Sequence, residues 1–147
     1  MTAVPFAGSG AALPALLGGD VDVSFENMPT VLSHIRSGDL RALAVTSAER
    51  SEYLPDVPTL SEVGEYNLDQ FVTTAWFGLV AHSSFPEEAQ SVMRDALAKV
   101  MEREEFLDFA DQLGAEPGQV SGEEFKQFIA DEVERWQGVA QQAGISQ

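Results

Sequence analysis

The side chains that could do chemistry in this sequence are few, and none of them is arranged as an active site. The two histidines, His34 and His82, show neither HxxxH nor HxH spacing, and the chain contains no cysteine. Ser9 lies between two glycines, but the GxSxG pattern of a nucleophile elbow is absent. The sequence therefore predicts no catalytic residue, no metal site and no cofactor. A hydrolytic enzyme is disfavoured because it would need a nucleophile and a base.

A glycine turn between a predicted strand and a predicted helix is the one feature suited to binding. Free N–H groups at the start of a helix lie at the positive end of its dipole, which suits a carboxylate. The groups concerned are those near Gly8, Ser9, Gly10 and Ala11. A second helix is predicted to start at Asn27, and both starts could face one crevice at the ends of parallel strands. The alternative is that the glycines only serve a tight turn.

Length, charge and hydropathy exclude several classes of protein. The chain has 147 residues, 24 acidic and 8 basic side chains and a net charge of -16, which opposes binding to nucleic acid or to an anionic membrane. Residues 51–147 hold 19 of the acids and 5 of the bases, as expected of solvated helical faces. No apolar run reaches the roughly 18 residues of a membrane helix. The first residues resemble no signal peptide.

The first part of the sequence has the pattern of a βαβ unit. A helix is predicted over residues 11–17, ended by Gly18. Residues 21–25 alternate apolar and polar side chains, as a half-buried strand does. A helix from Asn27 to Gly38 and a strand over residues 40–45 follow. Two strands joined by a helix imply parallel pairing with a right-handed connection.

The remainder of the sequence predicts an irregular segment, one long strand and three helices. Residues 47–58 are polar and contain two prolines, and a short helical turn is predicted over residues 60–63. Residues 71–81 are β-branched and aromatic and long enough to cross from one sheet to another. The three helices that follow carry apolar stripes, which predict core packing. Capping boxes are predicted at Ser84 with Glu87 and at Ser121 with Glu124.

Several motifs occur together in an order and spacing typical of one family. They are VPFAGSG at 4–10, LLGGDVDV at 16–23, GDLRALAVTS at 38–47, LPDVPT at 54–59, WFGL at 76–79, LGAEP at 113–117 and EF at 124–125. Together they resemble the Bug family, the periplasmic solute receptors of tripartite tricarboxylate transporters. The resemblance covers nearly the whole chain.

The resemblance implies an α/β fold, part of a type II periplasmic binding protein, with a parallel βαβ unit, a crossover strand and C-terminal helices. Residues 1–72 would be the remainder of ligand-binding domain two, and residues 73–147 the crossover strand and the C-terminal part of domain one. Such a protein is not an enzyme. It would bind a small carboxylate in the periplasm, although this chain shows no signal peptide, and would deliver it to membrane transporter subunits.

The same resemblance implies which residues bind the ligand. In the family, loops at strand ends hold the carboxylates, largely through backbone N–H groups. The corresponding residues here are Phe6, Ala7, Gly8, Ser9, Gly10, Ala11, Glu26 and Asn27, with Thr74 and Trp76 beside the crossover.

Members of the family are substantially longer than this chain, so we expect a truncated or separately encoded receptor. Strands 21–25 and 40–45 would then lack sheet neighbours, and exposed strand edges invite pairing with another chain. Two copies could complete each other as a homodimer. The alternative is a structural or interaction module that keeps the receptor fold without ligand binding.

Overall fold

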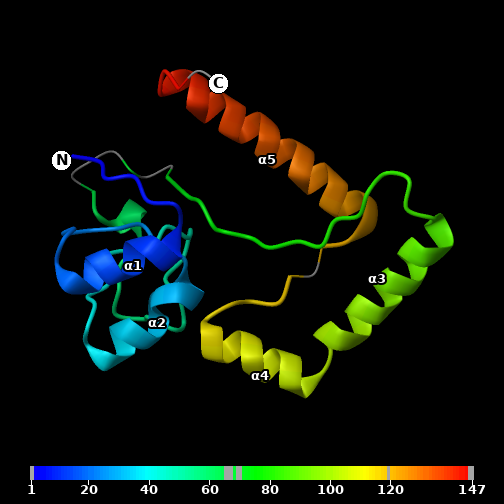
Figure 1. The fold of residues 1–147 in the computed structure, drawn as a ribbon, viewed down its shortest axis with the longest axis horizontal. Coiled ribbons are helices and arrows are strands. Elements are labelled where there is room, and N and C mark those ends of the chain that lie inside the picture. Colours follow the sequence, from blue (N-terminus) through cyan, green and yellow to red (C-terminus); the bar gives the residue numbers. More distant parts are fainter. Residues whose placement is uncertain (1, 65–67, 69–70, 119, 146–147) are drawn as a thin grey trace.

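The computed structural model describes residues 2–64, 68, 71–118 and 120–145. Over these residues the chain forms five α-helices and one short 3₁₀ turn, joined by extended segments (Figure 1). In chain order they are α1 (Ser9–Gly18), α2 (Met28–Ser37), η1 (Leu60–Glu62), α3 (Glu87–Met101), α4 (Glu104–Leu113) and α5 (Gly122–Gln142). Figure 1 shows α1, α2 and η1 gathered at one end, and the 71–81 segment running from them toward α3.

The predicted helices are confirmed, and glycines end three of them. Gly19, Gly38 and Gly114 adopt left-handed conformations, with φ of 78°, 84° and 66°, directly after α1, α2 and α4. A residue without a Cβ adopts this conformation at no steric cost. The short turn expected at Leu60 is also present as η1.

Both predicted capping boxes are wrong. Neither α3, which begins after Pro86, nor α5, which begins after Ser121, has a side-chain hydrogen bond at its cap. The Ser84 hydroxyl lies instead 2.7 Å from Nδ1 of His82. A capping box does form at η1, where Thr59 and Glu62 bond each other's backbone N–H groups.

The predicted strands run as extended segments but form no sheet within the described residues. We refer to residues 21–26, 40–45 and 71–81 as the three extended segments. The one pairing assigned is an isolated parallel bridge between Val45 and Thr59, and a single further bond joins the Thr73 N–H to the Thr46 carbonyl at 2.9 Å. Contrary to the βαβ prediction, segments 21–26 and 40–45 do not pair. A strand persists only where a neighbour accepts its backbone hydrogen bonds.

The buried core is small and lies where α2 meets α4. Among the described hydrophobic residues, Val31, Leu32 and Ala110 are buried. Gly114 allows the end of α4 to approach α2 closely, because an added Cβ would lie 2.8 Å from the Leu32 and Met28 side chains of α2. The sequence predicted buried apolar stripes on the later helices, and that expectation is wrong for most of them.

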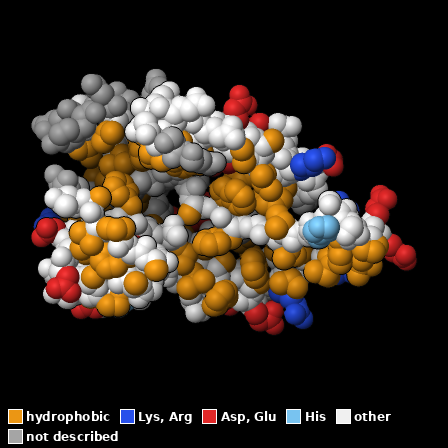
Figure 2. All heavy atoms as spheres, turned by 45° about the horizontal axis from the view of Figure 1, so that its top comes forward, with side chains coloured by type: hydrophobic (Ala, Val, Ile, Leu, Met, Phe, Trp, Pro, Cys, Tyr) orange, Lys and Arg blue, Asp and Glu red, His pale blue; other side chains and the backbone are white. Residues whose placement is uncertain are grey.

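The accessible surface is large for a chain of this size. The chain exposes 11708 Å², and a folded monomer of 15.9 kDa is expected to expose about 7,400 Å². Many large apolar side chains are exposed, such as Val92 on α3, Val133 on α5 and Phe77, which is 85% exposed. Figure 2 shows hydrophobic side chains gathered over a hollowed face of the molecule.

The 71–81 segment is attached to α5 through an aromatic cluster. Trp76 meets Phe125 and Phe128 edge to face, with ring centroids 5.7 and 5.2 Å apart. Arg135 of α5 donates a hydrogen bond to the Val72 carbonyl. These contacts fix the course of the segment that carries Trp76.

Gly78 is required for this attachment, because a Cβ at this position would lie 2.2 Å from Cζ of Phe125. We expect Gly78→Ala to lower the free energy of unfolding by about 1–3 kcal/mol, as overpacking does. Urea unfolding followed by tryptophan fluorescence measures it. Gly138→Ala is the matched control, since its Cβ would meet nothing within 4 Å and alanine favours the α5 helix. Equal stability of Gly78→Ala and the parent would contradict the proposed contact.

Candidate functional site

The three extended segments border one large concavity, which we call the central hollow. It is lined chiefly by residues 21–29, 39–51, 74–82 and 114–118, and has a volume of about 2240 Å³. A pocket for a small molecule measures roughly 300–1,000 Å³, so the central hollow is more than one such ligand could fill. Figure 2 shows apolar side chains around this hollowed face.

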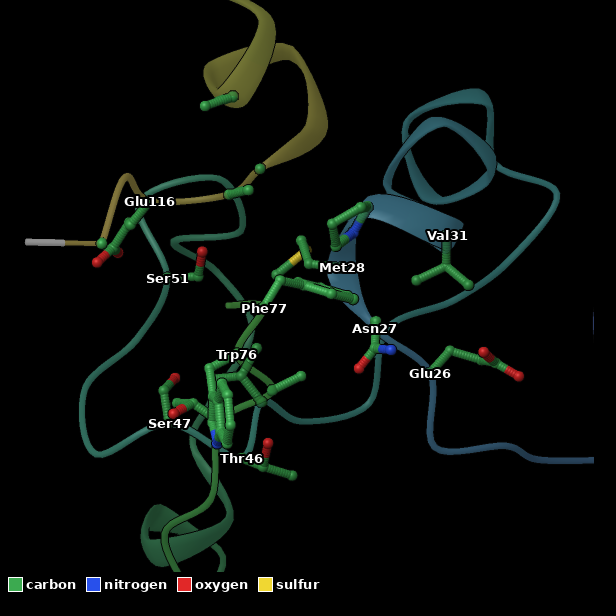
Figure 3. Close-up of a pocket in the computed structure, with 18 of the residues that line it drawn as sticks. Glu26, Asn27, Met28, Val31, Thr46, Ser47, Ser51, Trp76, Phe77 and Glu116 are labelled. Atoms are coloured by element: carbon green, nitrogen blue, oxygen red, sulfur yellow. The ribbon is translucent and has the colours of Figure 1, made fainter. Parts of the chain in front are cut away.

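Four of the ten predicted site residues line the central hollow. They are Glu26, Asn27, Thr74 and Trp76. In the view of Figure 3, Asn27 lies between Glu26 and Trp76. Trp76 is held on α5 by its aromatic contacts, and the bond from Thr73 to Thr46 holds the adjoining backbone. The structure thus brings predicted site residues from two separate parts of the chain, 26–27 and 74–76, to one surface.

The other six predicted residues lie in the first turn of α1 and in the three residues before it, outside the lining of the central hollow. They are Phe6, Ala7, Gly8, Ser9, Gly10 and Ala11. The carbonyl of Gly8 accepts bonds from the N–H groups of Ala11 and Ala12 at 3.0 and 3.1 Å. The prediction that Ala11 offers a free donor is therefore wrong. Among the described residues, no partner is present for the N–H groups of Ser9 and Gly10.

One side chain joins this turn to the central hollow. The Ser9 hydroxyl donates to Oε2 of Glu26 at 2.6 Å, and the Ser24 hydroxyl donates to Oε1 of Glu26 at 3.0 Å. The bond from Ser9 spans 17 residues of sequence. It ties the start of α1 to the loop that precedes α2.

The start of α2 offers fewer donors than the sequence analysis assumed. Asn27 precedes the helix in an extended conformation, and its carbonyl accepts the Thr30 N–H at 2.9 Å. Pro29 has no N–H group. Within the described residues this leaves the Met28 N–H and the Asn27 side chain, which makes no capping bond. An anion here would be held by a small number of uncharged donors.

Further polar residues line the central hollow that the sequence analysis did not select. Thr46, Ser47, Ser51 and Glu116 are labelled beside Asn27 and Trp76 in Figure 3. The Ser47 hydroxyl donates to the Glu49 carbonyl at 2.7 Å. Hydroxyl-bearing residues directly after a predicted strand were the available signal, since strand ends of α/β folds carry binding groups.

An ion pair beside the central hollow uses the charge of one lining arginine. Arg50 lies 2.7 Å from Glu62 through Nη2 and Oε1, and its Nε donates to the other carboxylate oxygen at 2.9 Å. The bonds from Arg50, together with the N–H of Thr59 at 2.8 Å, lower the pKa of Glu62 to about 2. The same pair raises the pKa of Arg50. Arg50 is therefore committed to Glu62 rather than to a solute.

The lining of the central hollow combines many apolar side chains with polar and charged ones, among them Asn27, Glu26 and Arg41. Concave, largely apolar surfaces with a few placed polar groups are typical of binding sites. No group of three or more potential metal ligands was found among the described residues. No described helix is long and apolar enough to cross a membrane.

Comparison with known proteins identifies the family. Residues 1–145 match the tripartite tricarboxylate transporter family receptor, TctC, and the chain belongs to this family. Protein BugT of Bordetella pertussis is 38% identical over 141 residues, which are 96% of this chain and 42% of that protein. The resemblance to Bug receptors is thereby confirmed. The family consists of substrate-binding receptors rather than enzymes.

Two solved structures share the fold. R. palustris Rpa4515 with adipate superposes with a TM-score of 0.88 at 32% identity, over 99% of this chain and 48% of that one. MatC (Rpa3494) from Rhodopseudomonas palustris with bound malate gives 0.84 at 30% identity, over 92% and 46%. The predicted fold class, part of an α/β periplasmic binding protein, is confirmed. The chain spans less than half the length of these relatives.

Glu62 gives this region a specific pH dependence. Its pKa is about 2 in the folded protein and ordinarily 4.5, so the folded state binds this proton less readily than the unfolded state. The stabilisation is therefore present above about pH 4.5 and lost as the pH falls toward about 2. Glu62→Gln is expected to make stability fall less steeply over this range, measured by urea unfolding at successive pH values. Glu123→Gln, which breaks the exposed pair with Lys126, is the control and should leave the slope unchanged. Identical pH profiles for Glu62→Gln and the parent would contradict this assignment.

Proposed function

We propose that the chain is the ligand-binding part of a periplasmic solute receptor that takes a small carboxylate and passes it to membrane transporter subunits. The observation that carries the proposal is the match, at a TM-score of 0.88, to a family structure described with a bound dicarboxylate. The second match is described with malate, which is also a carboxylate. We assign the binding groups to the starts of α1 and α2 and to Thr74 and Trp76.

The geometry supports this assignment through uncharged donors. The N–H groups of Ser9 and Gly10 lie at the start of α1, where the helix dipole favours an anion. Asn27 lies on the wall of the central hollow and carries side-chain N–H donors, and Trp76 adds an aromatic face to the same wall. Arg41 and Arg94 also belong to the lining of the central hollow.

The chain offers a direct test at Gly10. A Cβ at this position meets nothing within 4 Å, so Gly10→Leu leaves the protein's own packing intact and blocks only an approaching ligand. We expect a saturating carboxylate to stabilise the parent by about 2.7 kcal/mol at a hundredfold excess over Kd. Gly10→Leu should abolish this gain. The panel is citrate, succinate, malonate, aspartate and glutamate, followed by thermal unfolding.

Gly138→Leu is the matched control, because Gly138 is also open, lies on α5 and is absent from the lining of the central hollow. This variant should respond to ligand as the parent does. The alternative function, an interaction module without a ligand, predicts that no carboxylate shifts the parent. A shift that survives in Gly10→Leu would remove α1 from the site.

We further propose that additional polypeptide covers the central hollow, and that a second copy of this chain can do so. The exposed area exceeds that of a typical monomer by roughly 4,300 Å². Obligate protein interfaces bury about 2,000–5,000 Å² summed over both partners, or about 1,000–2,500 Å² on each, so the excess on one chain is more than enough for its side of such an interface. The extended segments that border the central hollow also offer backbone groups for pairing.

Sedimentation velocity tests the second-copy proposal. At micromolar concentration the chain is expected to sediment as a dimer, and Leu43→Glu, placed on an extended segment where Leu43 is 64% exposed, should shift it to monomer. Leu17→Glu on α1 is the control, since Leu17 is exposed but does not line the central hollow. A stable, folded monomer of the parent would rule out the homodimer.

A further inference from the structure

The carboxylate of Glu26 lies at the place where a ligand's carboxylate was expected. Ser9 is the first residue of α1, and its hydroxyl bonds Oε2 of Glu26 at 2.6 Å in a half-buried position. The Ser24 hydroxyl bonds the other oxygen at 3.0 Å. Glu26 is therefore held at the start of α1 from two sides.

This arrangement changes what the start of α1 can bind. A negative group near the first turn already compensates the positive end of the helix dipole. A second carboxylate at the same point would meet a like charge, which disfavours its ionised form. The lining of the central hollow includes Arg41, Arg50 and Arg94, of which Arg50 is paired with Glu62. At the start of α1 itself, the charged side chain that the structure places is Glu26. The charge on Glu26 therefore favours a ligand that places a hydrogen-bond donor, and not a carboxylate, beside the start of α1.

Glu26 retains the capacity to accept such a donor. An ionised carboxylate has about four acceptor positions, and the two serine hydroxyls use one on each oxygen. Glu26 belongs to the lining of the central hollow and precedes Asn27. In the view of Figure 3 the Glu26 carboxylate and the Asn27 amide point in different directions, so a ligand that contacts both must bring a separate group to each. A hydroxyl or ammonium group next to a carboxylate fits this pair of neighbours.

The two solved relatives show why a selecting residue is needed. One is described with adipate and the other with malate. Adipate carries carboxylates alone, whereas malate also carries a hydroxyl group. Receptors of one fold thus differ in whether their ligand brings a donor.

We propose that Glu26 is a specificity-determining residue that selects small carboxylates bearing a hydroxyl or ammonium group over those that bear carboxylates alone. The inference rests on the proposed function. Charged hydrogen bonds of this kind are among the strong ones in proteins. The hydroxyls of Ser9 and Ser24 have a positioning role, because they hold the Glu26 carboxylate in place.

The test compares matched ligands on the full chain by isothermal titration calorimetry. Succinate, L-malate and L-aspartate share one four-carbon dicarboxylate skeleton and differ by a hydrogen, a hydroxyl and an ammonium group. The parent should bind malate or aspartate at least about tenfold more tightly than succinate, the ratio expected of one hydrogen bond to a charged group. Glu26→Gln should reduce the ratio to within about threefold, chiefly by binding succinate more tightly. A loss of folding would weaken all three ligands alike and leave the ratio unchanged.

Two further variants distinguish a specific role of the Glu26 carboxylate in ligand preference from the effect of removing any negative charge. Glu26→Asp keeps the carboxylate and should retain the preference. Asp131→Asn removes one negative charge from α5, outside the lining of the central hollow, and should leave every affinity as in the parent. If the parent binds these ligands and Glu26→Gln, folded as judged by its thermal unfolding transition, keeps the parent's ratio, the role of Glu26 is overturned while the proposed function stands. If the parent binds none of the three, the proposed function fails and the inference fails with it.

Discussion

The structure depends on one constraint: an extended segment needs a neighbour for its backbone and a cover for its apolar face. Segments 21–26, 40–45 and 71–81 have little of either within the described residues. Two backbone hydrogen bonds at Val45, to Pro58 and from Leu60, and one from Thr73 to Thr46 connect these segments to other parts of the chain. The central hollow is the direct result, because the side chains that would form an interior stand around an open space.

The helices could be predicted from the sequence because their signals are local. A helix satisfies its own backbone bonds, so an apolar stripe and a terminating glycine such as Gly38 or Gly114 suffice to place it. The strands could be predicted only as extended stretches. Their pairing depends on residues distant in sequence, and alternation over 21–25 carries no information about a partner. The predicted burial of the later helices was wrong for the same reason. An apolar stripe indicates which face of a helix can be buried, but it does not identify the element that packs against that face.

The capping boxes were less predictable from the sequence than the helices at whose starts they were expected. The serine and glutamate spacing at Ser84 and Ser121 matches a capping box, yet Ser84 bonds His82 instead. Thr59 and Glu62 have the same spacing and do form the box, with Arg50 holding the carboxylate from the other side. A hydroxyl takes whichever partner the fold brings nearest, so such motifs identify candidates and not bonds.

For the candidate site, too, the sequence predicted which residues belong to it but not the hydrogen bonds that they make. Sequence analysis selected Glu26 and Asn27 as members of the site, and the structure places both on the central hollow. It could not foresee that the Glu26 side chain reaches Ser9, because that bond depends on the fold of the 17 residues between them. A family resemblance transfers positions, whereas the charge that a ligand meets at a position depends on the bonds made there.

Ligand binding and covering of the central hollow are consequently linked. Its volume of about 2240 Å³ exceeds what a small carboxylate fills, so a tight site requires that polypeptide occupy most of the space. Polypeptide that pairs with the extended segments would also hold Trp76 and Asn27 at fixed separation, and a solute bound between them would in turn stabilise that pairing. Linkage makes the effect reciprocal: whatever covers the central hollow raises affinity for the solute by the same factor by which the solute raises affinity for the cover.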